Sequence, residues 1–222
     1  MTDSRFKIVT TSGRYFDFKN INSESIHIKD ICHALPKVNR FTGHSTVPWS
    51  VGVHSLACYQ MAKDLGYSVR EQLLVLIHDF TEAYVGDVAS PLKYLLPDYI
   101  AIEKQVETAI YEHLRIDPPN DEECAKIKKI DLTLLMLEMR YFTNHDYTQF
   151  MNEDTFTEFI DNERYDLRLH TGYPHSAVSA VLEMAVKELL VLLGKEKVLK
   201  AKLEEAKKKY SKTLESLKER GD

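Results

Sequence analysis

Cysteine is scarce in this sequence, and none of it is arranged in a CxxC pair. Cys32, Cys58 and Cys124 are the three cysteines among 222 residues. An odd and scattered set argues against a disulfide framework and favours a reducing compartment. The chain also lacks an apolar run near the ~20 residues that a membrane-spanning helix needs. Its first residues contain no apolar segment of the signal-peptide type. We therefore expect a cytoplasmic protein that does not enter a membrane.

An excess of basic charge is absent from most of the chain. Residues 187–222 hold 11 lysines and arginines against 7 acidic residues, whereas the remainder holds 18 against 27. Duplex nucleic acid is bound through many basic contacts to phosphates. An acidic body therefore argues against a long nucleic acid as partner. It does not exclude a small anion that is held by a few basic groups and a metal.

Helical periodicity dominates what is present. The composition is that of a globular protein, with 44% hydrophobic and 28% charged residues. Residues 5–18 alternate loosely around Thr-Ser-Gly and predict a short β-hairpin. Helical spacing of apolar residues predicts further helices over 26–35, 50–66, 68–86, 98–114 and 121–143, and a short one over 153–161. The predicted fold class is mostly α, a helical bundle with a short N-terminal β-hairpin and a long C-terminal helix.

The last segment, about 176–217, carries apolar residues in alternating steps of four and three. Glu196 and Thr213 interrupt this pattern, and Gly194 weakens the helix. Such a stripe is typical of a helix that packs on a second subunit or folds back on its own domain. We divide the chain into a domain over 1–175 and a C-terminal helical extension over 176–222, and we expect a homo-oligomer.

Acidic residues appear at an unexpected place in "LLVLIHDFTEAYVGDVASPLKY", residues 73–94. A run of core-type residues passes without a turn signal into His78 and Asp79, and Glu82 and Asp87 follow. Burial of an unpaired carboxylate is costly, so such groups are paired, protonated or bound to a metal. A divalent ion would satisfy them.

Two further polar residues occupy segments that otherwise read as core. His54 lies in "SVGVHSLAC" and Asp131 lies in "KKIDLTLLMLEM". Taken singly, each has an ordinary explanation: a hydrogen-bonded core histidine, or a helix cap for Asp131. Asp79 could likewise pair with Lys93 or Arg40. Together, in the order H…HD…D on successive helices, the four residues predict a site for a divalent ion of the Zn, Mn, Fe or Co type.

This pattern resembles the HD-domain metal-dependent phosphohydrolase superfamily, which is named for its His-Asp doublet. "HDFTEAYVGDVASPLKY" is similar to the H-D-x-x-E-x-x-x-G-D-x-x-[ST]-P-x-K stretch of bacterial 5′-deoxynucleotidases and phage deoxynucleoside triphosphohydrolases. "SGRYFDF", "NRFTGH" and "SVGVHS" resemble the front half of the same branch, so the likeness covers about residues 10–142. It implies an HD-domain helical bundle that hydrolyses a phosphate ester or anhydride of a nucleotide.

The resemblance also implies roles for individual residues. The metal ligands would be His54, His78, Asp79 and Asp131. Glu82 and Asp87 would be the acids beside the metal. The substrate-binding residues would be Arg40, Phe41, Lys93 and Lys128. The ion would be Co, Mn, Zn, Fe or Mg. Because Glu82 follows His78 by four residues, we expect both on one helix face, where Glu82 takes a proton from the attacking water. Asp87 would protonate the leaving oxygen or bind the sugar. Lys128 is equally compatible with a solvated surface.

The favoured function is a 5′-deoxynucleotidase that releases orthophosphate from deoxynucleoside 5′-monophosphates. An alternative keeps the site and cleaves a deoxynucleoside triphosphate to deoxynucleoside and triphosphate. Motifs near the metal do not separate these two reactions, because pocket depth and basic residues beyond the α-phosphate decide between them. Val53 stands before His54 where some monophosphatase relatives have a glutamate, a departure that concerns monophosphate specificity and not the metal site. A non-catalytic nucleotide-binding module is a second alternative, which Glu82 disfavours because a sensor could dispense with it. A third is an assembly protein built on the C-terminal helix.

Overall fold

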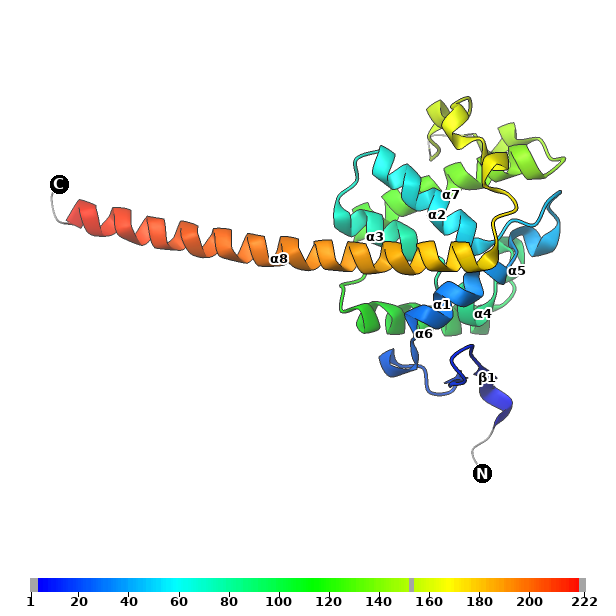
Figure 1. Cartoon of the computed structure of the whole chain (residues 1–222), viewed down its shortest axis with the longest axis horizontal. Coiled ribbons are helices and arrows are strands. Elements are labelled where there is room, and N and C mark those ends of the chain that lie inside the picture. The colour runs from blue at the N-terminus through cyan, green and yellow to red at the C-terminus, as the bar shows by residue number, and fades with distance from the viewer. Residues whose placement is uncertain (1–3, 152–153, 220–222) are drawn as a thin grey trace.

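The computed structural model describes residues 4–151 and 154–219. They form a helical body from which one long helix projects (Figure 1). Near the N-terminus, strands β1 (Lys7–Val9) and β2 (Tyr15–Asp17) pair antiparallel, with Ile8 opposite Phe16. The predicted fold class is thus confirmed: mostly α, with an N-terminal hairpin and a long C-terminal helix.

The helices start where local sequence signals place them. The Ser50 hydroxyl accepts a hydrogen bond from the Val53 amide, and Ser68 and Glu71 form a capping box. The α-helices are α1 (Ile28–Ala34), α2 (Val51–Asp64), α3 (Val69–Ile77), α4 (Glu82–Val85), α5 (Ser90–Lys93), α6 (Pro97–Leu114), α7 (Asp121–Phe142) and α8 (His175–Glu219). Short 3₁₀ turns lie at Ser4–Phe6, Ser23–Ser25, Leu35–Lys37, Arg40–Gly43, Tyr147–Phe150, Thr157–Phe159, Glu163–Tyr165 and Leu167–His170.

The prediction of one continuous helix over 68–86 is wrong. Helix α3 ends at Ile77 and α4 begins at Glu82. The His78 Nδ1–H donates to the Val75 carbonyl at 2.7 Å. In a continued helix that carbonyl would accept from the amide of residue 79. The chain therefore turns at 78–81, and His78 and Glu82 do not share the face of one helix.

Two apolar clusters hold the body together. One joins α1, α3, α6 and the first part of α8 with Phe16 of the hairpin. The other lies between α2 and α7 and includes Trp49 and Leu167. Helices α2, α3 and α7 all contact one another, so the polar residues that they carry can meet between the clusters.

Helix α8 divides into two parts. Val178, Leu182 and Leu189 are buried, and this part of the helix packs against α1 and α3. After Leu193 no described side chain is buried, and the helix continues beyond the body in Figure 1. The first part therefore folds back on its own domain, whereas the second part leaves its apolar residues exposed. We call Leu192, Leu199 and Leu203 the exposed stripe. The predicted interruption at Thr213 lies outside the described side chains.

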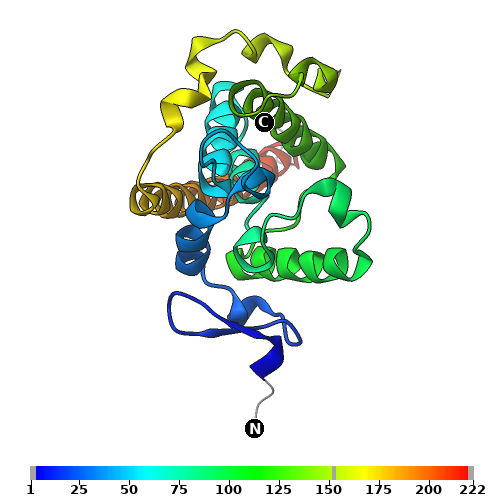
Figure 2. The same ribbon diagram turned by 90° about the vertical axis from the view of Figure 1, so that its right-hand side faces the viewer.

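The hairpin and the 143–174 segment lie at opposite ends of the body in Figure 2. The described residues of that segment are irregular, with several 3₁₀ turns. Of the helix predicted over 153–161, only Thr157–Phe159 is helical, as one 3₁₀ turn, and residue 153 lies outside the described residues. None of the described helices combines the length and the apolar character needed to cross a lipid bilayer.

Candidate metal centre

The four predicted metal ligands converge on one point. His54 comes from the first turn of α2, His78 and Asp79 from the end of α3, and Asp131 from α7. The distance from His54 Nε2 to Asp131 Oδ1 is 3.2 Å, and that to Asp79 Oδ2 is 3.5 Å. One donor atom from each of the four lies within 4.8 Å of the others. Because α7 begins at Asp121, Asp131 is not a helix cap.

These spacings suit a divalent ion. Bonds from such an ion to imidazole nitrogen or carboxylate oxygen are about 2.0–2.2 Å, so neighbouring donors around it are separated by ~3 Å or slightly more. His78 Nε2 lies 3.2 Å from Asp79 Oδ2, in the same range. The cluster can therefore hold a metal ion without rearrangement of the backbone.

Both imidazole rings are fixed with Nε2 toward the shared point. The Nδ1–H of His78 donates to the Val75 carbonyl, and the Nδ1–H of His54 donates to Glu138 Oε1 at 2.6 Å. A histidine that binds a metal usually donates its other ring N–H in this way, which sets the tautomer and the ring orientation. The same turn that interrupts the helix after Ile77 therefore orients His78.

Glu138 is a buried acid that the sequence reasoning missed. Its side chain is fully buried on α7 and accepts hydrogen bonds from His54, from Trp49 Nε1 at 2.7 Å and from Arg40 Nε at 2.9 Å. Burial opposes ionisation, but Arg40 and His54 outweigh it and lower the pKa of Glu138. An acid inside "LTLLMLEM", two helical turns after Asp131, was the available signal.

Arg40, which the resemblance assigns to phosphate, lies among the carboxylates. Besides Glu138, its guanidinium is 3.4 Å from Asp79 and 4.0 Å from Asp131. The alternative pairing of Asp79 with Arg40 is therefore present as well. Phe41, with its ring centroid 6.0 Å from the guanidinium carbon, has a φ of 58°. A bulky residue rarely adopts this left-handed conformation, and such strain gathers at functional sites.

The charge of the cluster favours a cation. Burial disfavours the charged form of His78, yet Asp79 and Asp131 hold the pKa of this imidazole well above its ordinary value. Burial would raise the pKa of Asp79, but His78 outweighs it and lowers that pKa to about 2. The carboxylates thus remain ionised and draw positive charge to the point where the donors meet.

Glu82 and Asp87 lie beside the cluster. Burial, then the charges of Asp79 and Asp87, raise the pKa of Glu82 to about 9, although Arg40 and Lys93 oppose the shift. Burial is also the main reason that the pKa of Asp87 is raised. Among the described residues, Glu82 Oε2 is a buried oxygen without a hydrogen-bond partner. A buried acceptor without a hydrogen bond lowers the stability of the fold unless a ligand or a water molecule donates to it.

A cavity of about 270 Å³ opens next to the cluster. His78, Asp79 and Lys93 line it, together with Glu103 and other residues of α6. Lys93 donates to Glu103 at 2.8 Å, so this predicted phosphate ligand borders the cavity but is already paired. Lys128 is exposed on α7, and none of the described contacts joins it to the cluster. Its assignment to the substrate stays a prediction.

Fold and site together define a mostly α-helical protein with a candidate divalent-metal centre of two histidines and two aspartates. No protein-family model matches the sequence. The chain belongs to the same family as the uncharacterized protein YfdR of Escherichia coli, to which it is 35% identical over 134 residues, 60% of this chain and 70% of YfdR. An uncharacterized protein of Rhodobacter capsulatus is 32% identical over 113 residues, 49% of this chain and 57% of that relative.

Proposed function

We propose that the protein is a metal-dependent phosphohydrolase of the HD-domain superfamily and that its substrate is a deoxynucleoside 5′-monophosphate. The observation that carries this proposal is the convergence of His54, His78, Asp79 and Asp131 on one point beside a cavity. The order of these ligands along the chain is that of the resemblance. The expected ion is one of Zn, Co, Mn, Fe or Mg.

A divalent ion at this point would polarise a phosphoryl oxygen and lower the pKa of a water molecule. Glu82 supplies the proton acceptor. Its Oε2 is buried and without a partner in the described structure, so it is free to hold the attacking water and take its proton. A bound cation would offset the negative charge of Asp79 and so lower the raised pKa of Glu82, which would favour its role as a base.

Two basic groups face the developing charge of the phosphoryl oxygens. Arg40 is buried with its guanidinium beside two of the proposed ligands, and Lys93 borders the cavity. Preorganised cations in a site that excludes water stabilise such charge far more than they would in solution. Asp87, partly buried and with a raised pKa, is suited to give a proton to the leaving oxygen.

The cavity favours a monophosphate over a triphosphate. Its volume of about 270 Å³ lies just below the range of ligand pockets, which is roughly 300–1,000 Å³. Lys93 and Lys104 line it, but each is paired with a glutamate of α6, Glu103 and Glu107 respectively. Few unpaired cations therefore remain to balance a chain of three phosphates.

A substrate panel tests the proposal. Metal-loaded protein is incubated with nucleoside mono-, di- and triphosphates, and the released orthophosphate, pyrophosphate or triphosphate is identified. We expect orthophosphate from deoxynucleoside 5′-monophosphates, with turnover lost in Asp79→Ala and kept in Asp98→Ala, which removes an exposed acid of α6. Release of triphosphate would instead establish the alternative reaction. Tight nucleotide binding without any product, or full activity in the presence of a chelator, would refute the proposal.

A further inference from the structure

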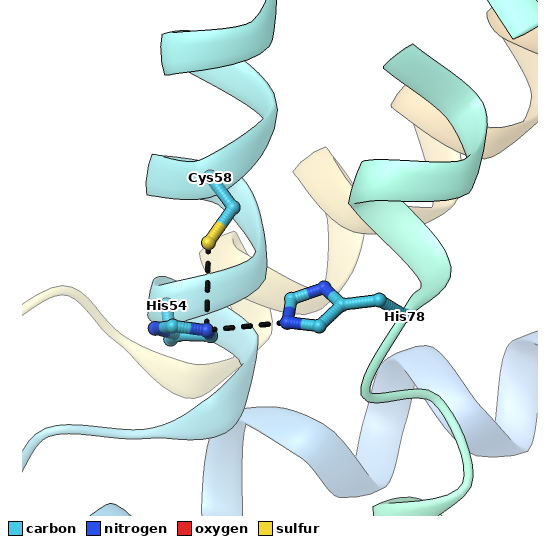
Figure 3. A group of neighbouring side chains, drawn as sticks. All are labelled: His54, Cys58 and His78. Atoms are coloured by element: carbon cyan, nitrogen blue, oxygen red, sulfur yellow. Dashed lines mark hydrogen bonds between the residues drawn. The ribbon is translucent and has the colours of Figure 1, made fainter. Parts of the chain in front are cut away.

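Cys58 carries a thiol that faces the metal centre from inside the protein. It lies one helical turn after His54, so α2 presents both side chains on one face. Its Sγ is 3.4 Å from His54 Nε2, and neither residue is exposed to solvent. Figure 3 shows the sulfur and the His78 ring approaching the same nitrogen of His54.

The three side chains form a donor set of their own. One donor atom each from His54, Cys58 and His78 lies within 4.8 Å of the other two. Both imidazoles use Nε2 here, since Glu138 and the Val75 carbonyl occupy their Nδ1 atoms. The thiol therefore faces the same two nitrogens as the aspartates do. A zinc–sulfur bond of ~2.3 Å beside a zinc–nitrogen bond of ~2.0 Å would leave the two donors ~3.5 Å apart.

Sulfur and carboxylates differ in their access to solvent. The thiol is fully buried, whereas the side chains of Asp79 and Asp131 are 19% and 36% exposed. The sulfur is thus buried more deeply than the two carboxylates, which lie toward solvent. A ligand at this buried position would not compete with a substrate that enters from the cavity.

An ordinary core position is the competing interpretation. Cys58 also belongs to the apolar cluster with Trp49 and Met61, and a buried cysteine commonly behaves as a small apolar residue. That role would not require the sulfur to lie against the metal-facing nitrogen of a histidine. The two interpretations predict different metal chemistry, which makes them separable.

We propose that Cys58 gives a sulfur ligand to the ion held by His54 and His78, and that this thiol makes the site prefer Zn²⁺, Co²⁺ or Fe²⁺ to Mg²⁺ and Mn²⁺. On binding, the thiol releases its proton to solvent and the thiolate takes its place at the ion. Thiolate selects the softer ions, whereas carboxylate and water suit the harder ones. The inference rests on the metal centre of the proposed function but not on the reaction.

Cobalt spectroscopy tests the ligand directly. Full-length protein is stripped with a chelator and titrated anaerobically with Co²⁺, and the near-ultraviolet absorption of a thiolate-to-cobalt transition is followed. We expect this band to saturate at one Co²⁺ per chain in the wild type and in Cys32→Ser, and to be missing in Cys58→Ser. Cys32 is the matched control because it is an equally buried free thiol elsewhere in the core.

Metal competition tests the selectivity. Against a chromophoric chelator, Cys58→Ser should lose at least about tenfold in affinity for Zn²⁺ and stay within about twofold for Mn²⁺. If Cys58→Ser does not fold, the band of the wild type still shows whether a thiolate binds the Co²⁺. A band that persists in both Cys32→Ser and Cys124→Ser would then identify Cys58 as the ligand by elimination.

Stoichiometric Co²⁺ binding without the band in the wild type, or a band that persists in Cys58→Ser, would overturn the inference. Absence of all metal binding would overturn it together with the metal centre. A normal band in a protein that hydrolyses no nucleotide would uphold Cys58 and refute only the proposed function.

Discussion

Replacement of Glu138 by glutamine removes one negative charge from the buried network behind the metal centre. The carboxylate receives three N–H donors, from His54 at 2.6 Å, Trp49 at 2.7 Å and Arg40 at 2.9 Å. Glutamine has nearly the same shape but only one acceptor oxygen. At least one of the donors must therefore face an amide NH₂ group in Glu138→Gln.

The less costly orientation of the glutamine can be deduced. If its oxygen takes the place of Oε1, His54 and Trp49 keep their acceptor, and only Arg40 loses one. A buried charge that loses its partner costs about 3–5 kcal/mol. Arg40 retains Asp79 and Asp131 nearby, so we expect a loss of about 2–4 kcal/mol in the free energy of unfolding. Because His54 remains oriented, metal affinity should fall only about tenfold, the lower end for such supporting residues.

Urea unfolding in the presence of a chelator measures the stability without the contribution of bound metal. Glu123→Gln is the matched control, since Glu123 is also a largely buried acid on α7 and pairs with an arginine, Arg70, at 2.7 Å. That pair is more exposed than the pair of Arg40 and Glu138. Glu123 also lies eight residues before Asp131, which is about 12 Å along α7. Glu123→Gln should therefore lower stability by about 1 kcal/mol and leave the affinity for the metal unchanged.

Two results would refute this reasoning. Unchanged stability of Glu138→Gln would mean that the buried carboxylate is not needed to balance Arg40. A similar loss of metal affinity in Glu123→Gln and Glu138→Gln would mean that both substitutions act by destabilising helix α7 as a whole, and that the orientation of His54 is not the cause.

Three further predictions address catalysis, packing and assembly. Glu82→Gln should keep the metal through dialysis while kcat falls by roughly 10²–10⁴, the scale of general acid–base help; loss of the metal would mark Glu82 as a ligand instead. A Cβ at Gly52 would lie 2.9 Å from the backbone nitrogen of Pro36, so Gly52→Ala should cost about 1–3 kcal/mol. A Cβ at Gly194 on α8 would meet nothing within 4 Å, so Gly194→Ala should raise the free energy of unfolding by about 0.5–1 kcal/mol. Equal changes of the melting temperature in Gly52→Ala and Gly194→Ala would contradict this prediction. We propose that the exposed stripe of α8 pairs with a second copy of the chain. Truncation after Glu196 removes none of the described buried side chains, so it should lower the mass measured by light scattering and leave the helical circular dichroism signal of the body intact. A full-length protein that is monomeric at micromolar concentration would refute this assembly.

Sequence alone determined most of the helices and the four residues of the candidate metal cluster. Helix limits follow from short-range signals, such as the capping box of Ser68 and Glu71, that act within one turn. The cluster residues were recognisable because histidine and aspartate stand where the pattern requires apolar side chains. The spacing of apolar residues also indicated the long C-terminal helix, because this spacing lies within a single segment of the chain.

Only the tertiary structure decided how those segments support one another. The break after Ile77 depends on a side chain that takes a backbone acceptor, which periodicity does not detect. Glu138 joins His54 across 84 residues and Arg40 across 98. Its apolar neighbours in the sequence mark it as a candidate buried acid, but they do not indicate these partners. Cys58 likewise reads as a core residue until the end of α3 brings His78 beside it. Whether a polar side chain on a helix meets solvent or a partner depends on how that helix packs against others, and this is set by contacts between distant parts of the chain.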